Sequence, residues 1–586
     1  MSDKPKSIWK RPIKGWWWLS ARLVTLVGLT GLMFLATLFC LSRDQSPPPS
    51  LPVVWAISIG IALVLSFSWA FIRWLCCWRN FKRFLFGLAC FATLIALFYA
   101  EEDWRGKHAW EKFKRDWEAK GERFDVASVI PPAVPDDQNF ALTPIMASTY
   151  EMYFDKAGHD LKPPNTNVVN RLRMTVVHNN DNGPTNGWSN WQTARKSDLK
   201  VWQNYYRTLT AKTGDFPVAP QPQSPAADVL LALSKYDSAI EELRQAGRLS
   251  ESRFPLNYDN ENPAVILLPH LSAIKPCCQV LGLRVLAELQ NGQSEPALAD
   301  VKLSLRLIDA VRTEPFLISH LVRLAALQIM LPPVWEGLAD HRWSDAQLVE
   351  LDQTLTRLDF LADYKLAMRS ELALQGGMFD SLRRHPEQIS NLYRISVADA
   401  ANPPIPPERI CRLIPSGWFY QNQLHCARPI VELYLPVADV KQRIISPAAL
   451  HRAAAQVGTD TQHITPFNIF EKWFLRQLGF GLAPRRFALG QASVDLAQTA
   501  IALERYRLAH GEYPESLDAL APKFIAKIPH DVINGQPLKY HRADDDQFIL
   551  YSVGWNETDD GGQIALTKLG NVDVEKGDWV WRYPAN

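Results

Sequence analysis

Histidines and carboxylates in the middle of the chain are the residue types best suited to chemistry. His270, His320 and His341 share an apolar, helix-like stretch with Glu314 and Glu371. Imidazole nitrogens and carboxylate oxygens are the ligands of hydrolytic zinc sites, which leave one position open for water. If the helices that carry them pack side by side, these residues could converge on a metal. The alternative is that each histidine is a surface residue or a hydrogen-bonded core residue, and the sequence leaves both interpretations open.

Local signatures of enzymes are otherwise missing from the sequence. It contains no H-E-x-x-H zinc motif, no G-x-S-x-G elbow, no Walker loop and no G-x-G-x-x-G. The aromatic and polar stretch PSGWFYQNQ at 415–423 has the composition of a binding loop, although a packed connector is the simpler interpretation. With 63 basic and 61 acidic residues the net charge is only +2, so the chain lacks the basic footprint of a nucleic-acid binder.

Cysteine spacing predicts neither a zinc site nor a redox site. Four of the eight cysteines follow the apolar start of the chain, namely Cys277, Cys278, Cys411 and Cys426. These four could pair in an oxidising compartment, for instance Cys411 with Cys426, or they could be buried free thiols. The sequence therefore predicts no particular disulfide.

The first hundred residues decide where any chemistry would take place. Three apolar runs, Leu23–Leu41, Leu51–Ile72 and Phe84–Ala100, each approach the roughly 20 residues that a helix needs to cross hydrocarbon. Tryptophans at 16–18 and at 74 and 78 mark the ends of runs, where indoles favour the lipid headgroup layer. We expect three transmembrane helices, with the lipid bilayer as a partner, rather than a cleaved signal peptide.

Basic residues orient these helices. Five lysines and arginines occupy 4–14 and four occupy 73–83, whereas the first loop offers only Arg43 against Asp44. Basic loops remain in the cytoplasm, so the amino terminus is expected there. Three crossings then place the carboxy-terminal bulk on the extracytoplasmic side, and failure of the third run to insert would reverse that placement.

Changes of pattern along the chain divide it into five segments. They are a cytoplasmic amino terminus with three transmembrane helices (1–100), an amphipathic helix with an irregular region rich in proline and asparagine (101–224), a helical domain (225–395), a connector (396–486) and a terminal module (487–586). Within the helical domain, Ser294 suits a helix cap and Ser344 with Gln347 forms a capping-box pattern. We expect an irregular antiparallel helical domain rather than a solenoid.

The terminal module predicts a long helix followed by a small antiparallel sheet. Leu496, Ala500 and Leu503 follow helical spacing up to Gly511, a residue suited to a left-handed cap. Strand-like stretches at 538–540 and 548–552 flank three aspartates and predict a hairpin.

Three blocks of this module, ALERYRLAHGEYPESLDAL, PHDVINGQPLKY and FILYSVGWNETDDGG, resemble the globular part of the major pseudopilins of type II secretion systems. The resemblance covers roughly the last 90 residues and implies an α+β pilin-like fold. The amino terminus lacks the short basic leader and start of a processed pilin, and Val532 replaces a common proline, so a pilin subunit is not expected. The whole chain also resembles large bacterial membrane proteins of the same layout, which implies no activity.

The resemblance also implies a calcium site, because pseudopilins of this type hold calcium in the loop after the last strand. Oxygen-bearing side chains in the corresponding region are Asn556, Asp559, Asp560, Asp573 and Asp578, and hard oxygen donors are the ligands that calcium prefers. By position, Asn556 and Asp578 match the family's ligands best. The alternative is a solvated acidic turn, since asparagine replaces an aspartate and the stretch TKLGNVDVEKG is inserted.

Two functions agree with these patterns. The first is a noncatalytic, membrane-anchored protein that contacts protein partners in the bacterial cell envelope or in secretion. The second is an extracytoplasmic hydrolase or peptidase with its site in the helical domain or beside 415–423. Three or more of the named histidines and carboxylates around an open cleft would favour the enzyme, and dispersed positions would favour the first function.

Overall fold

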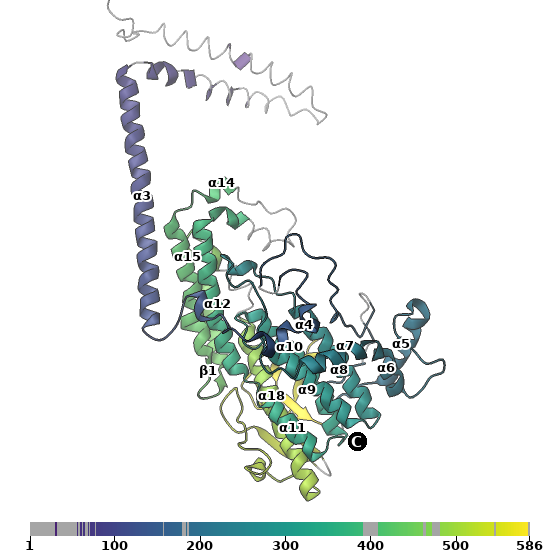
Figure 1. The fold of residues 1–586 in the computed structure, drawn as a ribbon. Helices are drawn as coiled ribbons and strands as arrows, with labels where there is room; N and C mark the ends of the chain where they lie inside the picture. The colour runs from purple at the N-terminus through teal and green to yellow at the C-terminus, as the bar shows by residue number, and fades with distance from the viewer. Residues whose placement is uncertain are drawn as a thin grey trace, which may run out of the picture. The chain divides into compact units, whose positions relative to one another are not determined.

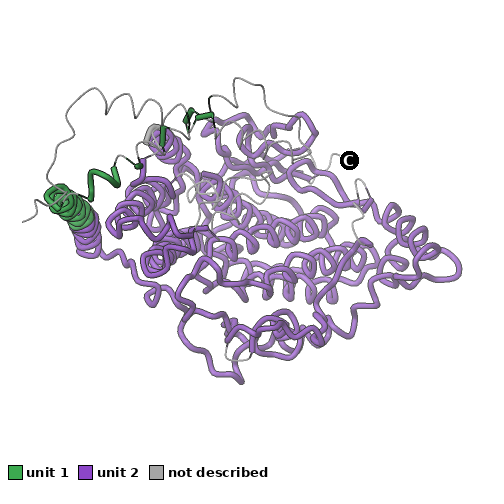
Figure 2. Tube along the Cα trace, turned by 90° about the horizontal axis from the view of Figure 1, so that it is seen from above, with its two compact units in different colours: residues 1–102 green, residues 103–586 purple. Residues whose placement is uncertain are grey.

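The computed structural model describes residues 78–155, 158–178, 183–184, 187–390, 408–460, 465–471, 481–543 and 547–583, with scattered positions between 28 and 76. Residues 1–102 and 103–586 form two compact units (Figure 2), and each is described by itself. The described part is mainly helical, as expected, with small antiparallel sheets toward its carboxy terminus (Figure 1). Most residues of the predicted spans Leu23–Leu41 and Leu51–Ile72 lie outside the described residues.

Helix α3 (Trp78–Glu118) joins the third predicted span and the predicted amphipathic helix in one element of 41 residues. It contains an 18-residue window with a mean hydropathy of 1.9, and no part of this window is buried. Toward its other end Trp110 and Phe113 are buried and pack edge-on against Phe124. One end of α3 is therefore apolar and exposed, and the other end belongs to the core of the second unit.

Consecutive helices build the centre of the second unit, where the sequence predicted helical structure. They are α6 (Pro225–Leu233), α7 (Asp237–Ala246), α8 (Leu271–Gln290), α9 (Ser294–Ala310), α10 (Leu317–Ala339), α11 (Asp345–Leu355) and α12 (Phe360–Arg384). The capping box of Ser344 and Gln347 starts α11 as predicted. The expectation that Ser294 caps α9 was wrong, because Gln293 occupies the cap and Ser294 is already helical.

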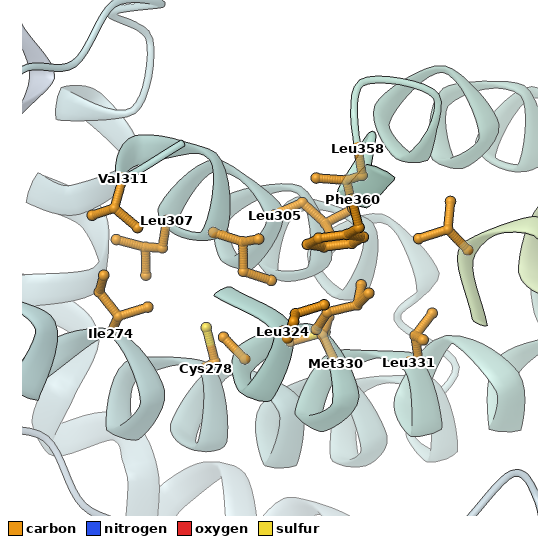
Figure 3. Close-up of a cluster of buried hydrophobic side chains, with 14 of the residues drawn as sticks. Ile274, Cys278, Leu305, Leu307, Val311, Leu324, Met330, Leu331, Leu358 and Phe360 are labelled. Atoms are coloured by element: carbon orange, nitrogen blue, oxygen red, sulfur yellow. The ribbon is translucent and has the colours of Figure 1, made fainter. Parts of the chain in front are cut away.

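The helices α8, α9 and α10 share one apolar core. Figure 3 shows Ile274 of α8 pointing toward Leu307 of α9, with Cys278 of α8 and Leu324 and Met330 of α10 further along the same layer, and all five side chains are buried. Each large apolar side chain that leaves water contributes roughly 1.5–3 kcal/mol. Helix α10 is also long and apolar enough to cross a membrane, with a window of mean hydropathy 1.5, but 61% of that window is buried. We therefore treat α10 as a core helix.

The region before α6 combines short elements with one helix that the sequence analysis missed. The short elements are η2 (Val126–Ser128), η3 (Asp136–Gln138), η4 (Phe140–Leu142) and α4 (Pro144–Ala147). The missed helix is α5 (Leu199–Thr213), which Asp198 caps and which ends at Gly214 with a φ of 71°. Its Trp202 and Tyr206 are buried. Asparagine, glycine and proline before α5 concealed its apolar stripe.

Short helices, not loops, fill much of the predicted connector. They are α14 (Glu408–Cys411), α15 (Ser416–Pro429), the π-helical turn η8 (Ile430–Tyr434), η9 (Leu435–Val437) and α16 (Pro447–Asp460), with the strand pair β1 (Ala438–Asp439) and β2 (Ile444–Ile445). The stretch 415–423, interpreted as a loop or a connector, forms the first half of α15. Its aromatic composition reflects packing, because Phe419 is buried and α15 lies against α12.

The carboxy-terminal part follows the predicted order of helix and hairpin. The long helix α18 (Ala483–His510) ends at Gly511, which has the predicted left-handed conformation with a φ of 82°. After η10 (Leu517–Leu520), one antiparallel sheet has the order β3 (Lys539–Ala543), β4 (Gln547–Ser552), β7 (Trp579–Arg582), and β5 (Ile564–Leu566) pairs with β6 (Val572–Gly577). Helix α18 packs on β4 and β7 and also on α10, α11 and α12. Helix α18 therefore packs against both the terminal sheet and the central helices.

The four cysteines beyond the apolar start are buried free thiols. Cys277, Cys278, Cys411 and Cys426 form no disulfide with one another. Burial raises the pKa of the Cys278 thiol to about 12, so this side chain is uncharged and behaves as a small apolar group.

Candidate functional site

A cleft of about 1060 Å³ opens between the irregular region and the start of α8. We call it the polar cleft. Its walls are formed by residues within 148–153, 170–178, 215–216, 235–236 and 267–276. Apolar side chains such as Met152, Phe216 and Leu268 alternate with charged ones on these walls. Concave sites of this size and mixed lining are where proteins commonly hold ligands.

Tyrosine hydroxyls hold one wall of the polar cleft in place. The Tyr236 hydroxyl donates to the Thr175 carbonyl at 3.0 Å and accepts from the Thr175 amide at 3.1 Å. The Tyr206 hydroxyl donates to the carbonyl of Val176 at 3.0 Å. Burial raises the pKa of both hydroxyls, so they remain protonated donors. An irregular backbone segment thus acquires a defined position from side chains of the 3₁₀ turn η5 (Ser234–Tyr236) and of α5.

The charged lining residues of the polar cleft are Arg173, His178, Lys235 and Asp215. His178 forms an ion pair with the Asp215 carboxylate through Nδ1. Lys235 Nζ donates to the Asp215 carbonyl oxygen at 3.0 Å and lies 3.9 Å from the centre of the Phe216 ring. Burial lowers the pKa of Lys235, while Asp215 acts in the opposite direction. Arg173 and Lys235 carry two positive charges on these walls against the single carboxylate of Asp215, which favours an anionic ligand.

Hydroxyl groups in the polar cleft are committed to the backbone. Ser148, Thr149 and Ser272 each donate at 2.7 Å to the carbonyl oxygen three residues earlier. A serine or threonine nucleophile instead requires a general base within hydrogen-bond reach of its proton. The polar cleft is therefore better arranged for binding than for acyl transfer.

Three of the residues proposed from the sequence as metal ligands do meet, but inside a closed core. His270 Nε2 lies 2.7 Å from Glu314 Oε1, and His320 Nε2 lies 3.1 Å from the Glu314 main-chain oxygen. Both imidazoles are fully buried. Glu371 Oε1 accepts the Leu317 amide at 2.9 Å. Among the described residues, no group of three or more histidine, cysteine, aspartate or glutamate side chains is placed to hold a metal.

The contacts of the buried cluster around His320 indicate a structural network. His320 Nδ1 lies 3.4 Å from Arg323 Nη1, and Arg323 forms an ion pair with Asp363. Burial, together with the Arg323 charge, lowers the pKa of His320 to about 3, so the ring is neutral. A catalytic metal site needs an open position for water or substrate, which this fully enclosed arrangement does not offer. The network instead ties α10 to α12.

His341, the third predicted histidine, lies apart from this network and joins α10 to α18. Its Nδ1 is 2.9 Å from Glu504 Oε1, and Glu504 also accepts from Arg507 and from the Tyr513 hydroxyl. Burial would raise the pKa of Glu504, but the hydrogen bonds from Arg507 and His341 outweigh it and lower the pKa to about 2. The carboxylate is therefore charged and anchors the terminal module to the helical layer.

The residues expected to bind calcium surround one loop but already hold one another. Asp578 is buried and accepts the amides of Asp560 at 3.2 Å and of Gly562 at 2.7 Å. Asn556 donates to Asp560 at 2.9 Å, and Asp559 pairs with Lys539. Asp573 lies on β6, beside Lys576.

These contacts fit the solvated-turn alternative better than a preformed calcium cage. Both Asp578 oxygens are directed at backbone donors, and two of the other carboxylates are neutralised by lysines. Calcium binding requires several oxygens to converge on one point. Calcium binding remains a prediction from the resemblance.

Sequence reasoning did not anticipate the polar cleft. Arg173, His178, Asp215 and Lys235 come from separate segments and follow no recognisable spacing. Only the fold brings them together, because the hydroxyls of Tyr236 and Tyr206 hydrogen-bond to the backbone of 170–178 and hold it against the helices.

Comparison with protein-family models, with curated proteins and with solved structures found no match. The resemblance of the terminal module to major pseudopilins therefore rests on its residues alone.

Proposed function

We propose that this chain is a noncatalytic protein anchored in the bacterial inner membrane, with its large unit outside the cytoplasm, where it binds a protein partner of the cell envelope. The observation that carries the proposal is α3, in which an apolar segment without buried residues continues into a half that is part of the core. An exposed apolar stretch of this length is costly in water and suited to hydrocarbon. The three predicted spans and basic amino terminus give the proposed orientation.

The polar cleft is the proposed binding site. Its cationic groups, Arg173 and Lys235, favour an acidic group on the partner, while Met152 and Leu268 favour an apolar neighbour. A protein segment that carries both kinds of side chain fits this lining. Contacts of this kind suit a role in envelope or secretion assemblies, which is also the setting implied by the pseudopilin-like module.

Crosslinking in native membranes tests the binding proposal. We expect full-length protein to capture a defined neighbour, and a variant with Arg173→Glu and Lys235→Glu to lose most of that capture, because both substitutions reverse the charge of the cleft. Lys568→Glu, which changes an exposed lysine outside the cleft, is the matched control. Equal capture by the wild type and the cleft variant, with unchanged melting curves, would remove the polar cleft as the binding site.

A hydrolase or peptidase is the second candidate, and the ion pair of His178 with Asp215 is the observation that favours it. An imidazole oriented by a carboxylate is the arrangement of a general base. His178→Ala should abolish turnover of a peptide or ester library if the enzyme is correct. Under the binding proposal, wild type and variant show the same background rate.

Calcium binding by the terminal module can be tested independently. A ligand that binds only the folded state raises its melting temperature. Melting curves of the full chain with calcium and with chelator, compared between wild type and Asp578→Asn, separate the two alternatives. A calcium-dependent rise that the variant loses establishes the site, and identical curves remove it.

A further inference from the structure

Exposed apolar side chains gather near the start of α15. Trp104, Ile410, Leu413 and Ile469 are 67%, 58%, 66% and 53% exposed. We call these four residues the apolar patch. They come from three separate stretches of the second unit, namely α3, the turn around α14 and the segment 465–471. Large apolar residues exposed on neighbouring elements indicate a contact surface.

The stretches that carry the apolar patch are fixed to residues 103–106 of α3. Asp103 Oδ1 accepts the Gly417 amide at 2.6 Å. Gly106 meets the backbone of Gly417 so closely that a Cβ at Gly106 would overlap the Gly417 carbonyl. The absence of a side chain at Gly106 thus allows the first turn of α15 to touch α3 directly.

Aromatic contacts fix the third stretch to the same part of α3. The Arg105 guanidinium lies 5.0 Å from the centre of the Phe467 ring, and Phe467 packs edge-on against Trp418 at 5.8 Å. Phe467 lies two residues from Ile469. Two members of the apolar patch, Trp104 and Ile469, therefore lie one and two residues from this contact between α3 and the segment 465–471.

The position of residues 103–106 in the sequence indicates what the apolar patch contacts. Ala100, the last residue of the predicted third span, precedes Asp103 by three residues in the same helix. With a rise of about 1.5 Å per residue, residues 103–106 lie within about 10 Å of the end of the apolar segment. This step rests on the proposed membrane anchor, since only a membrane-crossing α3 puts residues 103–106 at the bilayer surface.

The charges beside the apolar patch also suit a lipid surface. Arg409 and Arg412 flank Ile410 and Leu413 on an exposed turn, with Glu408 as an acidic neighbour. Arg412 also lies 3.5 Å from Glu387. Apolar side chains with arginines beside them are typical of segments that lie in the headgroup layer.

We propose that the apolar patch inserts into the headgroup layer of the extracytoplasmic leaflet and seats the large unit on the membrane next to α3. Trp104 and Leu413 enter the boundary between headgroups and acyl chains, and Arg409 meets lipid phosphates. The large unit then has a second membrane contact, formed by segments some 300 residues beyond α3 in the chain.

Site-specific photocrosslinking to lipid tests this inference. A photoreactive benzophenone amino acid is placed singly at 410, 413 or 91 of the full-length chain in nanodiscs of phosphatidylethanolamine and phosphatidylglycerol. Position 569 is the matched control, because Leu569 is 88% exposed and lies outside the apolar patch. We expect lipid adducts at 91, 410 and 413 to exceed those at 569 at least five-fold.

The four positions separate the inference from the proposed function. Strong adducts at 91 with only the 569 level at both 410 and 413 overturn the apolar patch and leave the anchor intact. Background adducts at 91 overturn the anchor and the patch that rests on it. In native membranes, a protein adduct at 413 in place of lipid also contradicts the inference. Unchanged melting curves verify that each labelled protein is folded.

Discussion

Helices α3 and α10 are both long and apolar enough to cross a membrane, yet they have opposite surroundings. The apolar window of α3 is entirely unburied, whereas 61% of the window in α10 is buried by neighbouring helices. The apolar run of α3 from 84 to 100 contains no charged residue, while α10 carries Arg323 and His320 in its buried face. Hydropathy alone therefore does not distinguish the exposed window of α3 from the core helix α10, whereas buried polar side chains with partners do.

The polar residues of α10 are tolerated because each has a partner. Arg323 donates to the Ile308 carbonyl at 2.8 Å and forms an ion pair with Asp363, and His320 is neutral. Under the proposed membrane anchor, lipid would offer α3 no such partners, and an equivalent arginine there would remain unsatisfied.

The strongest test of this contrast removes the partner in α10. Arg323→Met leaves Asp363 buried without its cation, and we expect the free energy of unfolding to fall by about 3–5 kcal/mol. Chemical denaturation in detergent measures this loss. The double variant Arg323→Met with Asp363→Leu should recover much of the stability, and a loss below about 1 kcal/mol in the single variant would contradict the structural role of the pair.

Placing an arginine in each helix sharpens the comparison. Leu94→Arg in α3 should weaken membrane insertion by about 2.5–3.5 kcal/mol while leaving the melting of the large unit unchanged, because Leu94 is exposed. Leu327→Arg in α10 should instead destabilise the large unit, since Leu327 is fully buried. Membrane flotation and thermal melting measure the two effects. If both variants changed only membrane flotation, or both changed only thermal melting, the contrast between α3 and α10 would be contradicted.

The pH dependence of stability tests a buried carboxyl of α12, Glu371, which accepts a hydrogen bond from the first residue of α10. Burial raises the pKa of Glu371 to about 7, against the hydrogen bond from Leu317 that favours the charged form. Between pH 4.5, near the pKa of the unfolded chain, and pH 7, the folded state binds the proton more tightly. This carboxyl therefore makes stability fall as pH rises through that window.

Glu371→Gln removes the titrating carboxyl and keeps an acceptor oxygen for the Leu317 amide. We expect the stability of the variant relative to wild type to rise by up to about 3 kcal/mol from pH 4.5 to pH 7 and then to level off. Denaturation curves at several pH values measure the difference. A difference that does not vary with pH would show that Glu371 is charged in the folded state.

The smallest expected effect compares two serines at helix starts. Ser344→Ala removes the cap of α11 and should cost about 1 kcal/mol. Ser294→Ala should cost less, because Ser294 is not a cap and only accepts from the Gln347 side chain at 3.1 Å. Equal losses would mean that the capping box does not stabilise α11 as described.

Local patterns in the sequence predicted local structure well. The capping box of Ser344, the left-handed cap at Gly511 and the hairpin of β3 and β4 each depend on neighbouring residues, and all three are present. Helix α5 escaped prediction because asparagine, glycine and proline surround it. The packing of the stretch 415–423 agrees with the favoured interpretation as a packed connector, but its helical conformation was not predicted, because aromatic side chains suit a loop and a packed helix equally.

Contacts between distant residues could not be predicted. The pairing of His270 with Glu314 and the polar cleft around Lys235 depend on how helices and irregular segments pack, and no spacing encodes that packing. The histidines were singled out by residue type, and only burial distinguishes a core network from an open site.

The membrane placement of the large unit is the central claim, and a reporter fused after Asn586 tests it most directly. In a bacterial host, a phosphatase that folds only outside the cytoplasm should be active in this fusion and should fractionate with the membrane. An inactive phosphatase, together with a bright fluorescent protein at the same position that folds only in the cytosol, would contradict the account.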